Sequence, residues 1–360
     1  MKIFVGMSGG VDSSLTAALL VEQGHDVTGV YMKNWSKDLP GMVCPWKDDY
    51  RDAKRVAVQL GIPFKLYDFE SEYRQRVVEY LLDGYRHGIT PNPDIMCNQE
   101  VKFSLFLETA ILDGADMIAT GHYASIRSKS EANGYPFSLH MAADRTKDQT
   151  YFLYRITEKA LGVVQMPIGV YADKSQVRAE AEKRGLATAQ KKDSQGICFV
   201  GKVGIKDFLL HELGEQPPGD IIDQRGARIG EHDGALFYTI GQRQGLGVGG
   251  GLPYYVTGKD MDKNEVYVTT DIQDQALWSD VIGLSELHWI NEPPRDGVTY
   301  AVRTRHRAAL ISANFTGDAS NNRGELHLGS PERAISPGQS VVLYEGDRVI
   351  GGGIVTRRHR

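Results

Sequence analysis

The chain has 360 residues, of which 41% are hydrophobic and 24% charged, and its formal net charge is −5. That length exceeds one ordinary hydrophobic core, so we expect two or three domains. The negative charge argues against a protein that coats nucleic acid indiscriminately, although a local basic face is still compatible with it. The sequence has no apolar run of about eighteen residues and leads directly into an apolar strand, so we expect a cytoplasmic protein with no membrane span.

The first 24 residues predict a strand, a glycine-rich turn and a helix. Lys2–Gly6 is a short apolar run, residues 8–13 read SGGVDS, and a helical rhythm of apolar residues then continues to Gly24. Glycines at a helix start let backbone N–H groups approach an anion, so we interpret the turn as a phosphate-binding loop. It has neither the Gly-Lys-Ser/Thr of a Walker loop nor the G-x-G-x-x-G of a dinucleotide fold. An ordinary glycine turn before a helix is the alternative.

Strand and helix patterns then alternate along the chain. We expect strands at 25–33, 63–69 and 116–121, with helices at 48–60 and 70–85. This alternation predicts an α/β domain with a doubly wound parallel sheet and helices on both faces. Ligands bind over the carboxyl ends of strands in such sheets, where Met32 would contact an adenine ring. A core methionine is the alternative for this residue.

The chain has three widely spaced cysteines, Cys44, Cys97 and Cys198, which form neither a disulfide framework nor a zinc-binding pair. In a reducing compartment such thiols are either inert core residues or chemically active ones. Cys198 lies between Gly196 and Gly201, with two lysines shortly before it. We therefore expect Cys198 to be a movable thiol in electropositive surroundings.

Cys97 is the second candidate for thiol chemistry. Two prolines, at 91 and 93, predict that no regular helix exists up to about Asp94, so we expect a helix capped near Asn98. Cys97 would then lie just before a helix N-terminus, a position that lowers the pKa of a thiol. Asp94, three residues earlier, suits a proton acceptor. A structural thiol is the alternative.

A hairpin and a charged loop follow. Strands at 124–127 and 137–141 are expected to pair around Asn133-Gly134. The next loop, before another predicted helix, suits phosphates or a polyanion if it lies beside a nucleotide site; a solvated helix start is the alternative. A further helix is expected at 173–184. The charged or polar residues of the loop are Asp144, Arg145, Lys147, Asp148 and Gln149.

Beyond residue 204 the chain becomes rich in glycine, proline and short β-like runs. We expect an α/β domain with the phosphate-binding loop at 1–204, a small β-rich domain at 205–276 and a C-terminal domain at 277–360. Six short strands in the last part predict an antiparallel β-barrel. Three arginines of this domain, at 303, 305 and 307, are expected to share one face of a strand. Together with the basic residues 357–360, this face would meet RNA phosphates. A solvated charged face is the alternative.

Five motifs, in order, carry a resemblance to a known family: SGGVDS, NPDIMCN, GHYAS, KDQTYFL and SQGICF. Together they resemble the tRNA-specific 2-thiouridylases (the MnmA/TrmU type), members of the PP-loop ATP pyrophosphatase superfamily. The resemblance extends over the whole chain. It implies adenylation of the C2 oxygen of the wobble uridine in tRNA, followed by sulfur transfer from a cysteine persulfide with release of AMP and pyrophosphate.

The resemblance also implies roles for individual residues. Cys198 would carry the persulfide, and Cys97 would be the nucleophile that forms a transient disulfide with it. Asp94 would be an acid/base that, with Asn92 and Pro93, contacts the target base. ATP, accompanied by Mg²⁺ but by no metal site of the protein's own, would contact Gly6, Met7, Ser8, Gly9, Gly10, Val11, Asp12, Ser13, Met32 and Gly121. Contacts to tRNA would come from Lys147, Asp148, Gln149, Arg305 and His306.

The implied partners are tRNAs for Lys, Glu and Gln and a sulfur-donor protein, either a cysteine desulfurase or a relay protein. Two other functions compete with this one. A PP-loop ligase that amidates a small metabolite, such as argininosuccinate or GMP synthetase, has no need of two thiols or a basic barrel. A non-enzymatic adenine-nucleotide-binding module of the universal-stress type gives no reason for an Asp in the SGG loop.

Overall fold

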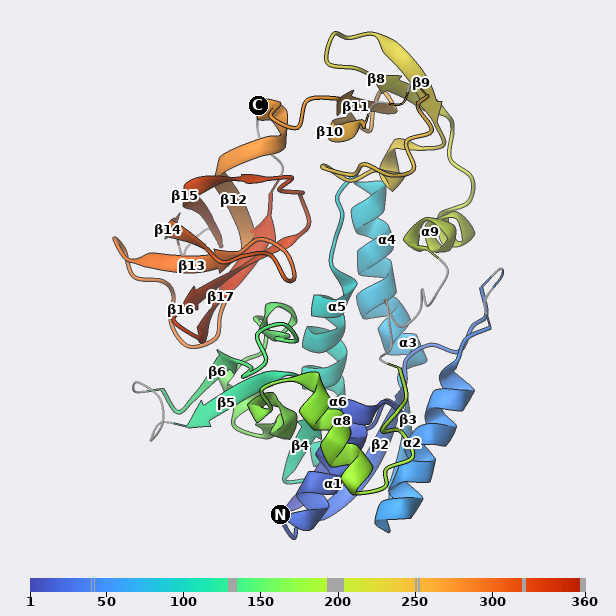
Figure 1. Ribbon diagram of the computed structural model, residues 1–360, viewed down its shortest axis with the longest axis vertical. Coiled ribbons are helices and arrows are strands. Elements are labelled where there is room, and N and C mark those ends of the chain that lie inside the picture. The colour runs from blue at the N-terminus through green and yellow to red at the C-terminus, as the bar shows by residue number, and fades with distance from the viewer. Residues whose placement is uncertain are drawn as a thin grey trace.

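The computed structural model describes residues 1–39, 41, 43–128, 135–192, 204–249, 251, 253–318 and 322–356. Figure 1 shows an α/β body that contains the N-terminus, a β-barrel beside it, and a small β-sheet beyond a central column of helices. The predicted fold class is therefore confirmed. Within the described ranges, no helix is long and apolar enough to cross a membrane.

The first sheet has five strands in the order β3-β2-β1-β4-β7, and all their pairings are parallel. The short edge strand β7 was not predicted, because two residues carry no periodicity to detect. The strands are β1 (Lys2–Gly6), β2 (Asp26–Lys33), β3 (Phe64–Asp68), β4 (Met117–Thr120) and β7 (Val164–Gln165).

Helices cover both faces of this sheet, as the alternation of side chains along a strand requires. Ile3 and Val5 of β1 belong to one apolar cluster with α1, α2 and α8, whereas Phe4 between them belongs to the cluster on the other face. All three side chains are fully buried. The helices of the first face are α1 (Val11–Glu22), α2 (Trp46–Leu60) and α8 (Lys174–Lys183).

Two long helical runs pack on the opposite face and form the central column in Figure 1. The first confirms the helix predicted at 70–85 and contains one π-helical stretch. The second returns toward the sheet and carries Cys97. They comprise α3 (Glu70–Tyr73), η1 (Arg74–Val78) and α4 (Glu79–Arg86), then α5 (Pro93–Met96), η2 (Cys97–Leu105) and α6 (Phe106–Leu112).

The strand order places a topological switch point between β1 and β4. The chain leaves β1 toward β2 on one side and returns later to β4 on the other side, with Gly6 paired to Thr120. The loops after these two strands, 7–10 and 121–123, therefore leave the same edge of the sheet in opposite directions. Such a crevice is where open α/β sheets bind their ligands.

Six C-terminal strands close into the predicted antiparallel barrel, in the order β12-β15-β14-β13-β16-β17 with β17 paired back to β12. Closure leaves no free sheet edge. The strands are β12 (Trp278–Trp289), β13 (Thr299–Arg303), β14 (Ile311–Asp318), β15 (Arg323–Arg333), β16 (Ser340–Glu345) and β17 (Arg348–Val355).

The two strands of the hairpin predicted at 124–141 are confirmed, although they join the barrel and not the first sheet; the turn predicted at Asn133-Gly134 lies outside the described residues. The hairpin consists of β5 (Ala124–Ser128) and β6 (Phe137–Met141), and β6 pairs with β17 through His140 and Arg348. Asp347 strengthens the junction, because its carboxylate accepts from the Arg127 guanidinium at 2.5 Å. The α/β body is thus joined to the barrel by shared strands.

A small sheet in the order β10-β11-β8-β9 follows the first domain along the chain and precedes the barrel. Its strands are β8 (Gly219–Ile222), β9 (Arg228–His232), β10 (Tyr255–Asp260) and β11 (Glu265–Thr269), preceded by α9 (Ile205–Leu213). The remaining short helices are η3 (Thr150–Phe152), α7 (Glu158–Leu161), η4 (Pro167–Val170), η5 (Ala235–Phe237) and η6 (Gln275–Leu277). The helix expected after Gln149 is thus only the single turn η3.

The arginine-bearing strand was predicted wrongly. β13 ends at Arg303, and residues 305–308 form a turn in which the Ala308 N–H donates to the Arg305 carbonyl at 3.1 Å. Arg307 has φ of +62°, which no strand allows. Arg303 is buried while Arg305 and Arg307 are exposed, so the three do not share a face. The R-x-R-x-R pattern is typical of one face of a strand, but here the same residue spacing continues from the end of a strand into a turn.

Candidate active site at the switch point

The glycine-rich loop lies between β1 and α1, as predicted. Gly10 is the N-cap of α1 and supplies no side chain to bind the first N–H groups of the helix. Ser13 instead closes the loop from inside, since its Oγ accepts from the Ser8 N–H at 3.1 Å. Gly9 has φ of +76°, and a Cβ there would lie 2.3 Å from the Asp49 carbonyl oxygen of α2. Only glycine fits this position, because the backbone of the glycine-rich loop packs directly against the start of α2.

The carboxylate of Asp12 is the most strongly contacted group of the loop. Lys174, the first residue of α8, places its Nζ 2.6 and 2.7 Å from the two carboxylate oxygens. The Tyr123 hydroxyl donates to Oδ1 of the same carboxylate at 2.8 Å. Sequence reasoning missed Lys174, because nothing local shows that residues 162 positions apart meet.

Gly121 lies against the start of α1, and Met32 lies against the end of β1. A Cβ on Gly121 would lie 2.7 Å from the Ser13 N, so the β4 loop touches the start of α1. The Met32 methyl group approaches Gly6 at the carboxyl end of β2. The donors, glycines and apolar edge fit an adenine nucleotide whose phosphates lie on the α1 start.

Cys97 lies inside a helix, which corrects our prediction of its surroundings. The helix begins at Pro93, with the Asn92 side chain accepting from the Asp94 and Ile95 N–H groups at 3.1 and 3.4 Å. Proline is compatible with the first helical position, because its missing N–H would have had no helical partner. Cys97 is therefore one turn beyond the N-terminus, and it is 4% exposed.

Asp94 is one turn before Cys97 on the same helix. Burial raises the pKa of the Asp94 carboxyl, with the Lys102 ammonium acting in the opposite direction. A raised pKa moves a carboxyl toward the range in which an acid/base works near neutral pH. The geometry is thus compatible with the predicted acid/base role.

His122 connects this helix to the nucleotide loop. Its Nε2 lies 3.4 Å from the Lys102 Nζ, and its Nδ1 lies 2.8 Å from the Thr120 Oγ1. Burial lowers the pKa of His122 well below its ordinary value, so the ring is neutral. His122 follows Gly121 directly. The segment 121–122 therefore contacts the helix that carries Cys97 through Lys102, and it contacts the start of α1, which carries Asp12, through Gly121.

Contacts from the other domains shape the loop that leads to Asn92. The Thr90 N–H donates to the Pro337 carbonyl at 3.0 Å, and the Gln339 amide donates to the Thr90 carbonyl at 2.6 Å. The Thr90 hydroxyl meets the Thr239 hydroxyl of the small domain at 3.0 Å. Thr90, two residues before Asn92, is thus held by two other parts of the chain, which no local sequence pattern indicates.

The expected RNA contacts at 147–149 differ from one another in the structure. The Asp148 carboxylate is fully buried and forms an ion pair with Arg303 at 3.0 Å. The Gln149 side chain accepts from the Tyr123 N–H at 2.9 Å. Lys147 is partly exposed. The buried Asp148 side chain therefore links the first domain to the barrel and is not accessible to RNA, whereas the Lys147 side chain is partly accessible.

The two barrel residues expected at the RNA surface lie together on the turn after β13. Arg305 is exposed, and the His306 ring packs against Phe152 with centroids 4.4 Å apart. Burial lowers the pKa of His306. This turn therefore lies beside the 144–152 segment of the first domain. Cys198 and residues 357–360 lie outside the described residues.

Cys44 is buried, with its Sγ 3.7 Å from the Trp35 carbonyl oxygen. Burial raises the pKa of its thiol. Both observations indicate an unreactive structural thiol.

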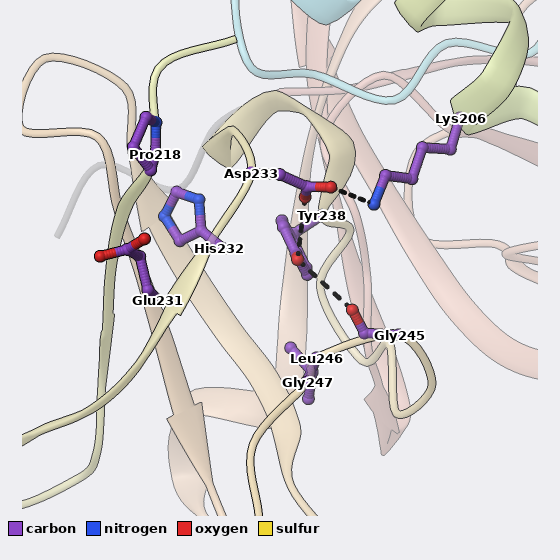
Figure 2. A pocket seen from close by; sticks show the side chains of 9 residues that line it. All are labelled: Lys206, Pro218, Glu231, His232, Asp233, Tyr238, Gly245, Leu246 and Gly247. Carbon is purple, nitrogen blue, oxygen red and sulfur yellow. Dashed lines mark hydrogen bonds and ion pairs between the residues drawn. The ribbon is translucent and has the colours of Figure 1, made fainter. Parts of the chain in front are cut away.

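Two cavities lie away from the switch point. One, of about 330 Å³, is in the small domain, where Lys206 pairs with Asp233 across its wall (Figure 2). The other, of about 1060 Å³, lies between all three parts of the chain. Four carboxylates, on Asp260, Asp262, Asp280 and Glu325, and two ammonium groups, on Lys259 and Lys263, line the larger cavity, so its net charge is negative and disfavours RNA phosphates. Among the described residues no group of three His, Cys, Asp or Glu side chains could hold a metal ion.

The fold and the loop define the class: a PP-loop protein, with the glycine-rich cradle at the switch point of a parallel sheet, followed by two β domains. Family models divide the chain in the same way. Residues 1–202 match the tRNA methyl transferase HUP domain, 206–270 the tRNA methyl transferase PRC-barrel domain, and 279–355 the aminomethyltransferase beta-barrel domain.

The chain belongs to the tRNA-specific 2-thiouridylase family. It is 43% identical to the tRNA-specific 2-thiouridylase MnmA of Enterococcus faecalis, 44% to that of Streptococcus sanguinis and 45% to that of Shouchella clausii. Each alignment covers 100% of this chain and 96 to 97% of the relative. A solved 4-thiouridine synthetase–RNA complex with bound ATP aligns with 59% of this chain and 50% of that chain, at 16% identity and a TM-score of 0.35.

Proposed function

We propose that this protein is a tRNA-uridine 2-sulfurtransferase that uses ATP and a cysteine persulfide to replace the C2 oxygen of the wobble uridine by sulfur. The observation that carries the proposal is full-length identity of 43 to 45% with relatives named tRNA-specific 2-thiouridylase. The arrangement at the switch point supports it, because an anion-binding loop and a thiol-bearing helix meet there around His122. We propose that residues 1–204 carry the chemistry and that 205–276 and 277–360 position the RNA.

ATP supplies the activation that this reaction needs. A urea-type carbonyl oxygen is a poor leaving group, whereas the same oxygen carried away as AMP is a good one. The residues that would hold the nucleotide are the α1 start for its phosphates and Met32 for its base. Asp94, with its raised pKa, would move a proton at the target base.

Sulfur transfer divides between two thiols. Sulfur arrives on Cys198 as a persulfide, whose terminal sulfur ionises more readily than a thiol and forms the bond to C2 as the C2–oxygen bond breaks. The Cys97 thiolate then forms a bond to the Cys198 sulfur and breaks the S–S bond, which leaves 2-thiouridine and a Cys97–Cys198 disulfide. A dithiol reductant supplies two electrons and two protons to restore both thiols.

The proposed substrate is tRNA for Lys, Glu or Gln, and the donor is a desulfurase or relay protein. The deciding experiment incubates the protein with ATP, Mg²⁺, a donor protein that carries a persulfide, a dithiol reductant and tRNA with a wobble uridine, followed by nucleoside analysis. We expect 2-thiouridine, together with AMP and pyrophosphate in equal amounts. ATP-dependent product that persists in a Cys97→Ser, Cys198→Ser double variant would favour a ligase instead. Absence of pyrophosphate release with every tRNA would favour a nucleotide-binding module.

A further inference from the structure

We propose that the Lys102 ammonium is the cation that stabilises the thiolate of Cys97. This inference rests on the proposed function, in which Cys97 is a nucleophile, and deepens it by naming the group that keeps this sulfur reactive. Cys97 is buried, and burial disfavours the charged form of a thiol, so a thiolate at this place needs a neighbouring cation. Lys102 lies outside all five motifs. It would act through its charge alone and keep its proton throughout the reaction.

The register of the helix brings Lys102 to the side that carries Cys97. The stretch η2 that begins at Cys97 is π-helical, and the hydrogen bonds of a π-helix join residues five apart. Lys102 is five residues after Cys97, so it lies one turn further along the same side. An α-helix would separate two such residues by about 140° around its axis. Long side chains on helices point back toward the N-terminus, which directs that of Lys102 toward the turn with Cys97.

The charge of Lys102 acts on groups at both ends of this region. Asp94 is one turn before Cys97, and the Lys102 ammonium opposes the rise that burial causes in the pKa of the Asp94 carboxyl. On the other side, burial lowers the pKa of His122, and the same ammonium lowers it further. The cation is therefore felt from Asp94 to His122, and Cys97 lies on the helix between Asp94 and Lys102.

Lys102 is held in place by a neutral group. Among the described residues its one hydrogen-bonding partner is His122, whose Nε2 lies 3.4 Å from the ammonium nitrogen. An ammonium can only donate, so Nε2 accepts and the ring proton is on Nδ1, which donates to the Thr120 Oγ1 at 2.8 Å. The imidazole thus orients Lys102 without balancing its charge. A half-buried cation with only a neutral partner favours the binding of an anion beside it.

The other cations around this helix already lie near carboxylates. Arg76 of η1 lies 3.8 Å from the Glu100 carboxylate, and Arg155 lies 3.8 Å from the Glu286 carboxylate. In the part of the chain that the structure describes, no carboxylate lies within 4.0 Å of the Lys102 ammonium. Lys102 is therefore the cation of this region that is available to a thiolate.

The test titrates Cys97 as the sole thiol of the full-length chain, in a Cys44→Ser, Cys198→Ser background. Thiolate formation is followed by its absorbance at 240 nm against a reference protein in which Cys97 is also Ser. Lys102→Met should move the midpoint of the titration upward by roughly one to three pH units, the effect of losing an opposite charge. Lys102→Arg keeps the charge and should keep most of the original midpoint. Lys54→Met, on the exposed side of α2, is the matched control and should leave it unchanged.

A merely structural role for Lys102 predicts no change of the midpoint in the folded Met variant, and that result would overturn the inference. An equal shift in Lys54→Met would overturn it too. So would weaker binding of ATP by Lys102→Met with an unaltered titration, because the charge would then serve phosphates. If Lys102→Met does not fold, Lys102→Gln and Lys102→Arg are compared by the same titration. Wild-type protein that forms no 2-thiouridine from a persulfide donor would contradict the proposed function and leave the titration result standing.

Discussion

Arg303 in the barrel and Asp148 in the first domain form a buried ion pair, with 3.0 Å between Nη1 and Oδ2. The Asp148 carboxylate also accepts from the Ala142 N–H at 3.0 Å and from the Thr150 hydroxyl at 2.7 Å. The Arg303 guanidinium lies 5.5 Å from the centre of the Tyr344 ring. The pair therefore fixes the loop beside Gln149 against the wall of the barrel, and Gln149 in turn holds the backbone of Tyr123.

Removal of one partner of this pair should destabilise the protein strongly. Arg303→Met leaves the Asp148 charge buried without its cation, which costs about 3–5 kcal/mol in comparable cases. Denaturant unfolding measures the loss, and the neighbouring exposed Arg305→Met is the control, expected to stay within about 0.5 kcal/mol of the wild type. Equal stability of the two variants would show that the pair does not hold the domains together.

Asp12→Asn should abolish tRNA-dependent pyrophosphate release and preserve the fold. The substitution removes the charge that holds Lys174 and keeps the shape of the side chain, which is partly exposed. A pyrophosphate assay with circular dichroism as the folding check tests this, with Asp116→Asn as a control outside the loop. Unchanged turnover in Asp12→Asn would remove the PP-loop assignment.

The three thiols should differ in a labelling experiment with a ³⁵S-persulfide donor protein. Cys198→Ser should accept no label and support no thiolation. Cys97→Ser should accept label on Cys198 but fail to pass it to tRNA. Cys44→Ser should retain thiolation, because the Cys44 thiol is buried and its pKa is raised. Label on Cys97 in the Cys198→Ser variant would reverse the first two roles.

Stability should decrease in acid because of His122. Burial lowers the pKa of this ring in the folded protein, so below the unfolded value of about 6.5 the unfolded chain binds a proton that the folded one does not. The contribution is therefore complete above about pH 6.5 and is lost below it by about 1.4 kcal/mol per pH unit, until the folded pKa is reached.

Urea unfolding at pH 7.5 and 5.5 measures this effect as a difference between variants. His122→Asn should lose less stability than the wild type between the two pH values, while the exposed His87→Asn should follow the wild type. Identical pH dependence in all three proteins would mean that His122 titrates normally.

The turn after β13 is expected to contact tRNA phosphates. Arg305 and Arg307 are exposed there, so replacing both by Glu should weaken tRNA binding and reduce the slope of log affinity against log salt by roughly 0.7–0.9 per lost contact. ATP binding should not change. An unaltered salt slope would show that the turn is merely solvated.

The periodicity of apolar residues and the positions of turn-forming residues were sufficient to predict the α/β sheet, the hairpin and the barrel. The apolar run of β1, the glycines before α1 and the alternation of elements are local signals, and each reflects backbone geometry that the residues themselves impose. Two of the mistakes were also local. Pro93 begins a helix where we expected it to forbid one, and Arg303 ends a strand that we extended to Arg307.

The sequence by itself determined the fold class, the glycine-rich loop between β1 and α1 and the family resemblance, because these depend on residues close together along the chain. Only the tertiary structure decided that Lys174 meets Asp12, that Asp148 is buried against Arg303, and that Gln339 holds the loop before Asn92. These pairs are separated by more than 150 residues and arise from the packing of α8 on α1 and of the barrel on the first domain. Such contacts depend on where whole elements pack, which residue types and local spacing do not encode.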